Sequence, residues 1–300
     1  MRKACFLGFI CALFPRAGRA EVPAPIAAAN SEVAASFDLR QLSYSEHNNG
    51  LVPGAPDTLD SESGFLPGLR VQASLQHDLE GLMGASTEYF AASLSVLRGT
   101  VAYDGAMERL SSDGRISLTP YTATSGATLF GATAAEGISF RLGDSAALTP
   151  LLHYGFREWW RKLGQGTAQQ YQETYTHHEL GVGALGQFAF GDRVVVDGEL
   201  TVGAVVAASM EDDLAPSTSV ETTLKAGPLV SGAIGIDFAL SPEMHLLAAY
   251  RARFFTYGRS APVSLPPPNQ DLGVTEPDSS SFEQNVDVSF GWSFGSDDGP

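Results

Sequence analysis

Hydrophobic and polar residues alternate with a period of two along most of the chain, from about residue 33 to residue 294. In the last such stretch, Asn285 to Phe294, every even-numbered residue is apolar and every odd-numbered residue is polar or glycine. Side chains of a β-strand point alternately to its two faces. The pattern therefore predicts strands with one apolar face and one mixed face, and no helical period competes with it.

Breaks in this alternation predict ten strands. Their approximate ranges are 32–44, 66–77, 88–103, 124–142, 148–162, 170–190, 193–210, 220–240, 243–259 and 282–294. Short connections, such as those at Gly81 and Gly191-Asp192, alternate with long ones, such as 46–64, 104–117, 211–219 and 261–281. The long connections hold much of the Pro, Asp, Asn and Ser, which is typical of loops.

Two all-β architectures fit this pattern. A soluble sandwich turns its apolar faces inward, whereas a transmembrane barrel turns them toward lipid and its polar faces toward the lumen. The even strand count, the alternation of short and long connections and strands above the ~9–11 residues needed to cross lipid favour the barrel. Aromatic residues such as Trp160, Phe188 and Phe238 lie toward the ends of the proposed outer face, as at membrane interfaces.

The predicted fold is thus all-β: a transmembrane antiparallel up-and-down β-barrel of about ten strands, with long surface loops and short periplasmic turns. In the last strand, Val286, Val288, Phe290 and Trp292 are expected to face lipid, and Asp287 to face the lumen. A barrel of this kind belongs in the outer membrane of a Gram-negative cell envelope.

The first twenty residues have a different character. Arg2 and Lys3 precede the apolar run 4–14, and small residues flank Arg19. This order predicts a secretory signal peptide over residues 1–20 and a barrel domain over residues 21–300. Cys11 is an unfavourable lipoprotein anchor because bulky Ile10 precedes it, and with Cys5 it completes the cysteines of the chain.

The charge balance is strongly acidic. The chain carries 34 Asp and Glu against 18 Lys and Arg, a net charge of −16. The predicted signal peptide contains four basic and no acidic residues, so its removal leaves a net charge of −20. Such a chain lacks the cations that neutralise phosphates, and we expect no nucleic-acid partner.

Short motifs carry a resemblance to a family. Tyr103-Asp104-Gly105, Trp159-Trp160-Arg161, Tyr257-Gly258-Arg259-Ser260 and Glu276-Pro277-Asp278-Ser279 occur in this order along the chain. Together with a last strand that closes on aromatic Phe294, they resemble small ten-stranded porin-like outer-membrane proteins. The tail 295–300 departs from that terminal signal. The resemblance implies a barrel fold, an outer-membrane location and contact with outer-membrane lipid and the assembly machinery. It implies no reaction.

The lumen-facing positions predict what fills the barrel. Acidic residues at inward positions are Asp38, Glu173, Glu179, Asp197, Glu199, Asp237, Glu283 and Asp287, and basic ones are Arg40, Arg70, Arg141, Arg157, Arg251 and Arg253. A barrel of ~8 strands is filled by its own side chains, and ten strands lie near that limit. The sequence therefore predicts an ionic plug, with a narrow pore for small solutes as the alternative.

A lumen charge cluster is the candidate site. Its predicted members are Arg70, Arg157, Glu173, Glu179, Arg251, Arg253, Glu283 and Asp287. Because the last two strands are consecutive and antiparallel, Arg251 and Arg253 are expected to pair with Glu283 and Asp287.

Candidate catalytic and metal residues are few. His177, with Glu173 and Glu179 nearby on the inward face, could act as a general base. Omptin proteases also have ten strands, but their Asp-x-Asp and Asp-x-His pairs are missing here, so we expect no enzyme. Adjacent His177 and His178 point to opposite faces and cannot share a metal. The acidic run 211–213 is expected to be a solvated loop rather than a calcium site.

No cofactor and no metal centre are therefore predicted. Three function classes remain: a structural barrel or small-solute channel, a surface interaction protein acting through loops 46–64 and 261–281, and, least favoured, a rim hydrolase.

Overall fold

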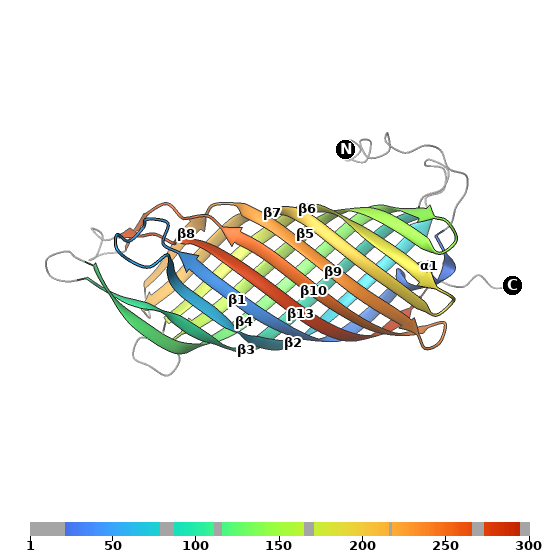
Figure 1. Ribbon diagram of the computed structural model, residues 1–300, viewed down its shortest axis with the longest axis horizontal. Helices are drawn as coiled ribbons and strands as arrows, with labels where there is room; N and C mark the ends of the chain where they lie inside the picture. Colours follow the sequence, from blue (N-terminus) through green and yellow to red (C-terminus); the bar gives the residue numbers. More distant parts are fainter. Residues whose placement is uncertain are drawn as a thin grey trace, which may run out of the picture.

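The computed structural model describes residues 22–78, 87–110, 116–164, 171–215, 218–265 and 273–294 of the chain. These residues form a closed antiparallel barrel of ten strands, which confirms the predicted fold (Figure 1). The main strands are β1 (Glu32–His47), β2 (Thr58–Asp78), β3 (Thr87–Leu110), β4 (Ile116–Leu142), β5 (Ala146–Leu163), β6 (Tyr171–Phe190), β7 (Val194–Ala215), β9 (Gly227–Ala239), β10 (Met244–Tyr257) and β13 (Asp278–Ser293).

Three short strands supplement the ten. β8 (Thr218–Leu224) pairs with β7 and, with β9, takes the place of one predicted strand. β11 (Val263–Ser264) and β12 (Gly273–Val274) pair with each other inside the last long connection. Each main strand pairs with its neighbour, and the pairing of β1 with β13 joins the first strand to the last.

The two ends of the barrel differ, and we call them the turn end and the loop end. At the turn end, Gly143 and Gly191 have φ of +73° and +64°, a conformation that glycine adopts without steric cost. The turn predicted at Gly81 lies outside the described residues. The loop end holds the long connections, and helix α1 lies at the turn end (Figure 1).

The strands extend further toward the loop end than predicted. Asp104 and Gly105 pair with Thr122 and Tyr121, although they were expected in a loop. The acidic run 211–213 likewise belongs to β7, so its prediction as a loop is wrong; Glu211 and Asp213 are exposed, as expected, whereas Asp212 is buried. Apolar alternation marks the part of a strand that faces an apolar medium. Backbone pairing continues beyond it, so the pattern underestimates strand length.

Helix α1 (Ala24–Ala29) was not predicted. It has only six residues, too few to show a helical period, and Pro25 occupies its first turn, where a proline is tolerated. Ile26 is fully buried, against Ala147, Ala189 and Val195 of the barrel wall. The helix therefore packs into the turn end. No described helix is long and apolar enough to cross a membrane.

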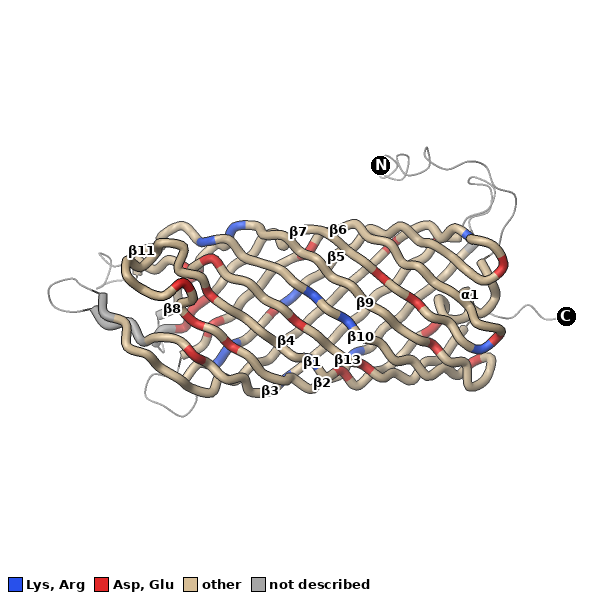
Figure 2. Tube along the Cα trace, viewed as in Figure 1, with Lys and Arg blue, Asp and Glu red and all other residues tan. Residues whose placement is uncertain are grey.

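The outer face is apolar, as the alternation predicts. In β13, Val286, Val288, Phe290 and Trp292 are each more than half exposed, whereas Asp287 is 2% exposed. The same division recurs in the other main strands. Acidic positions occur along the whole barrel, with a group of them near its loop end, and several basic positions lie midway along it (Figure 2). Burial of charge inside and exposure of apolar side chains outside is the arrangement of a barrel that faces lipid.

Candidate functional site

The inward side chains of each strand form layers along the barrel axis. From the turn end to the loop end, the inward residues of β1 are Glu32, Ala34, Ser36, Asp38, Arg40, Leu42, Tyr44 and Glu46. Charge is thus followed by an apolar and aromatic stretch and then by charge again. β5 and β6 repeat this order, and β10 passes from charged to aromatic residues and ends there, so the lumen is filled in layers rather than lined uniformly.

The middle layer is a set of ion pairs, which we call the lumen belt. Its members are Asp38, Arg40, Arg70, Arg157, Glu179, Arg251, Arg253, Glu283 and Asp287. Five guanidinium groups face four carboxylates. Buried charges persist when they are paired and hydrogen-bonded, and nearly every belt charge is directly paired.

Glu283 is the most heavily paired carboxylate of the belt. Arg157 donates two hydrogen bonds to it, one of 2.8 Å from Nη1 to Oε2 and one from Nη2 to Oε1. Arg40 donates a third, of 3.2 Å. Since Arg157 lies on β5 and Glu283 on β13, these bonds cross the lumen and tie opposite walls together.

The predicted pairing of the last two strands is only half right. Arg251 pairs with Asp287, but Arg253 pairs with Glu179 across the lumen, Nη1 to Oε1 3.0 Å. Arg253 and Glu283 are direct neighbours in the strand register. Glu283 nevertheless turns toward Arg157 and Arg40, because two guanidinium groups compete for it more strongly than one.

His177 lies just above the belt and is fully buried. Its Nε2 is 3.1 Å from Glu179 Oε1, and the Tyr257 hydroxyl is 2.7 Å from its Nδ1. Both ring nitrogens are therefore engaged. The side chain has no open face for a substrate, so the geometry does not supply an accessible general base.

An apolar and aromatic layer separates the belt from the loop end. We call it the aromatic layer; its principal members are Leu42, Tyr44, Leu66, Leu97, Trp159, Tyr175, Phe255 and Tyr257, each at most 3% exposed. The rings of Tyr44 and Trp159 meet edge to face at 5.1 Å between centroids, and those of Tyr175 and Tyr257 stack at 5.9 Å. Side chains so fully excluded from water leave no aqueous path between them.

Above this layer lies the loop-end cluster, formed by Arg161 with Glu46, Glu62, Glu173 and Glu276. Arg161 is fully buried, and its nitrogens lie 2.6 Å from Glu173, 3.3 Å from Glu62 and 3.4 Å from Glu46. Its guanidinium also stacks over the rings of the aromatic layer, 4.9 Å from the centroid of Tyr44.

Glu276 completes the cluster from the connection before β13. Its Oε1 accepts a hydrogen bond of 2.5 Å from Tyr175. Burial, followed by the negative charges of Glu46 and Glu173, raises the pKa of Glu276 well above its ordinary value. A protonated Glu276 relieves part of the repulsion that four carboxylates around one arginine would otherwise produce.

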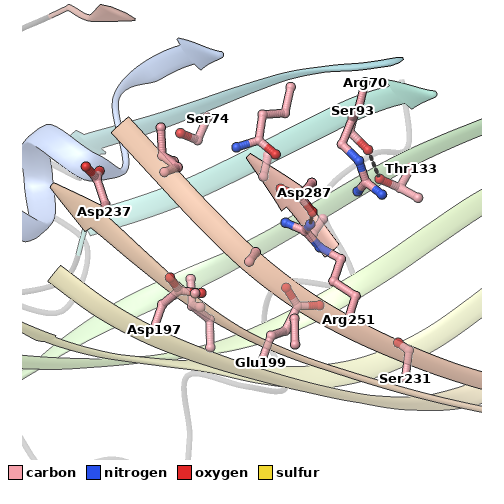
Figure 3. Close-up of a pocket in the computed structure, with 18 of the residues that line it drawn as sticks. Arg70, Ser74, Ser93, Thr133, Asp197, Glu199, Ser231, Asp237, Arg251 and Asp287 are labelled. Carbon is pink, nitrogen blue, oxygen red and sulfur yellow. Dashed lines mark hydrogen bonds and ion pairs between the residues drawn. The ribbon is translucent and has the colours of Figure 1, made fainter. Parts of the chain in front are cut away.

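A cavity lies on the other side of the belt, toward the turn end. Its volume is about 240 Å³, and its walls come from both the belt and the turn end. Asp197, Glu199 and Asp237 lie along one side of it, and Arg251 faces Asp287 nearby (Figure 3). The polar lining suits several water molecules, which need hydrogen-bond partners of this kind.

The structure places the predicted site residues in two groups. Arg70, Arg157, Glu179, Arg251, Arg253, Glu283 and Asp287 lie in the lumen belt, and Glu173 lies in the loop-end cluster. Arg141, expected in the lumen, instead bonds Gly143 and Asp144 at the exposed turn. Arg141 occupies an inward position of β4, but it lies at the turn end, where the lumen ends.

Sequence reasoning missed Arg161, Glu46 and Glu62. All three lie at inward positions of their strands, but they were assigned to strand ends or loops. Extending the alternation of inward and outward positions by two or four residues beyond the apolar part of each strand would have placed them in the lumen.

Comparison with known proteins places the fold. No protein-family model and no curated protein sequence matches the chain. Among solved structures, the outer membrane protease OmpT from Escherichia coli is similar over 88% of this chain and 97% of its own, with a TM-score of 0.55 and 9% identity. The translocator domain of the autotransporter NalP from Neisseria meningitidis gives a TM-score of 0.42 at 12% identity, over 88% of this chain and 89% of its own. The likeness to OmpT shows that the chain shares its closed β-barrel fold.

Proposed function

We propose that this chain is an integral outer-membrane protein whose barrel is closed by its own side chains and acts as a rigid scaffold rather than as an open pore. The observation that carries the proposal is the aromatic layer: between the belt and the loop end, Leu42 and Leu66 are fully buried, and Tyr44 and Phe255 are 1% exposed. Ions cross a barrel only through connected water, which this layer excludes.

The apolar outer face supports the location. In this assignment the turn end faces the periplasm, the loop end faces the cell exterior, and outer-membrane lipid and the assembly machinery are the partners. Insertion would follow cleavage of the signal peptide proposed over residues 1–20, which lie outside the described part of the chain.

Single-channel recording of the refolded protein in planar bilayers tests closure. We expect no stable current steps across a range of voltages. Heat-modifiable migration on gels, run on the same sample, shows that the inserted protein is folded. Reproducible steps from folded wild-type protein would establish the alternative, a narrow channel for small solutes.

Substitution on the two faces tests the membrane location. Leu69 is 67% exposed on the outer face, and we expect Leu69→Arg to cost about 2–4 kcal/mol of stability in lipid vesicles if this position lies near the bilayer midplane. Gln72, three residues along β2, lines the cavity, and Gln72→Arg should cost less because the new charge enters a polar space. Equal costs in urea titrations would contradict the assignment of the faces.

One observation favours a surface-interaction role for the loop end. The Arg259 side chain donates hydrogen bonds of 3.0 Å to the carbonyls of Asn48 and Asn49, and its backbone N–H donates to Asp278. These bonds tie the first long connection to the last one and hold both in one arrangement. Deletion of residues 50–55 should abolish attachment of the protein to other cell surfaces without loss of the folded barrel, if the scaffold serves to display this rim.

A rim hydrolase has less support. Both ring nitrogens of His177 are engaged, and the side chain lies beneath the aromatic layer, out of reach of a substrate at the loop end.

A further inference from the structure

Three buried side chains that could ligate a metal meet at the turn end of the barrel. They are Glu32 at the start of β1, Asp237 near the end of β9 and His245 near the start of β10, and one ligand atom of each lies within 4.8 Å of the others. All three are at most 5% exposed. His245 Nδ1 lies 2.8 Å from Asp237 Oδ1 and 3.9 Å from Glu32 Oε2.

The barrel wall is shaped to bring Glu32 to the other two. β13 separates β1 from β10, and its Gly291 pairs with Ala34 on one side and with His245 on the other. A Cβ at this glycine would lie 2.7 Å from Glu32 Oε2. Glycine here therefore leaves the space through which the carboxylate of Glu32 reaches across β13 toward His245.

The carboxylates lack other partners that would explain their burial. Within the described residues, Glu32 Oε2 accepts no hydrogen bond, and neither Glu32 nor Asp237 forms an ion pair with a lysine or arginine. A protonated His245 supplies one positive charge against two carboxylates. A buried carboxylate without a compensating partner is costly, and a divalent cation would neutralise both.

We propose that Glu32, Asp237 and His245 bind a divalent transition metal, with Zn²⁺ and Mn²⁺ as the ions to test. Ligand distances of about 2.0–2.2 Å in a tetrahedral site put the ligand atoms roughly 3.4 Å apart. The present separations of 2.8 and 3.9 Å from His245 Nδ1 bracket that value, and all three ligand atoms lie within 4.8 Å of one another, so the side chains need only local adjustment to complete the site. A nitrogen ligand favours such ions over Ca²⁺ and Mg²⁺, which prefer oxygen alone.

The cavity supplies the remaining position. Glu32 and Asp237 line it, so water can reach the metal as a fourth ligand. Helix α1 lies close by at the turn end, where Asn30 donates hydrogen bonds to Gln76 and Gln187. Bound metal would connect the first strand to the β9–β10 pair across β13. It would stabilise the barrel where the last strand pairs with the first.

Metal titration of the full folded protein in detergent, after treatment with a chelator, tests the proposal. We expect one Zn²⁺ or Mn²⁺ per chain by calorimetry, together with a rise in the unfolding temperature. Glu32→Gln and His245→Asn should each weaken binding by more than ~10-fold, since the first replaces an anionic carboxylate with a neutral amide and the second removes the imidazole nitrogen. His77→Asn removes an exposed histidine near the same end and should leave binding unchanged.

Unchanged binding in the Glu32 and His245 variants, or no binding of either ion to the wild type, would overturn the proposal. If these variants do not fold, anomalous scattering from crystals of the wild-type protein soaked with Zn²⁺ decides the matter. A peak between the three side chains supports the site, and a peak elsewhere or none refutes it.

Discussion

The lumen belt and the loop-end cluster are built from the same chemical groups in different proportions. In the belt, five arginines meet four carboxylates, and Glu283 alone receives hydrogen bonds from both Arg157 and Arg40. In the loop-end cluster, four carboxylates surround the single guanidinium of Arg161, with Glu276 protonated more readily than usual. Loss of either Arg157 or Arg40 leaves Glu283 paired with the other, whereas the loop-end cluster depends on one arginine.

The aromatic layer explains how two such different regions coexist in one lumen. It separates them by two inward positions on β1, occupied by Leu42 and Tyr44, and by one on β5, occupied by Trp159. Charged side chains of the belt therefore cannot form ion pairs with those of the loop-end cluster. The same layer contacts Arg161 through its ring faces, so it also stabilises the one cation of the cluster.

Arg161→Met should produce the largest effect. It preserves much of the side-chain volume but leaves Glu46, Glu62 and Glu173 buried without the guanidinium that pairs with them. Removing one partner of a buried ion pair costs about 3–5 kcal/mol. We expect a loss of this size in the free energy of unfolding, measured by urea titration in lipid vesicles.

Arg157→Met is the matched change in the belt. Glu283 keeps the hydrogen bond from Arg40, so the loss should be smaller than for Arg161→Met. Arg141→Gln at the exposed turn should cost less than about 1 kcal/mol, as exposed ion pairs do. If Arg157→Met proves as damaging as Arg161→Met, the two regions do not differ in the way described.

Much of this layering follows from residues that the sequence shows directly. Inward positions of a strand can be read from the alternation alone. On β1 they show the three regions in order: Arg40 of the belt, Leu42 and Tyr44 of the aromatic layer, and Glu46 of the loop-end cluster. The partner of Arg253 could not be predicted, since it depends on which side chains reach across the lumen and not on strand neighbours. Glu32 and Arg161 were missed because charged residues near a strand terminus resemble loop residues in a one-dimensional pattern. Helix α1 is too short to have a recognisable period.

The double substitution Arg251→Ser with Arg253→Ser tests whether the belt or the aromatic layer seals the barrel. It removes the arginine partners of Asp287 and Glu179, which keep their hydrogen bonds with Asn285 and His177, and the expected cost is about 1–3 kcal/mol because both guanidinium groups are about a quarter exposed. The aromatic layer stays in place, so we expect no ion current in planar bilayers.

A cation-selective current from this variant, with none from the wild type, would show that the belt itself is the seal. In that case the aromatic layer must open readily. Gln72→Arg, which adds a charge to the same cavity, serves as the control because it removes no ion pair.

The smallest effect concerns the pH dependence of the loop-end cluster. Because its pKa is raised in the folded protein by burial and by neighbouring carboxylates, Glu276 binds a proton more tightly folded than unfolded. Its contribution to stability is therefore fully present below the unfolded pKa, about 4.5, and is lost as the pH rises from there through the folded pKa. The slope of the unfolding free energy against pH due to this group cannot exceed the uptake of one proton, about 1.4 kcal/mol per pH unit.

Glu276→Gln keeps a neutral hydrogen-bonding group at this position and should flatten the dependence of stability on pH above about 4.5. Glu243→Gln, at the opposite end of the barrel, should leave the wild-type slope intact. A slope that survives Glu276→Gln would mean that another member of the cluster carries the proton.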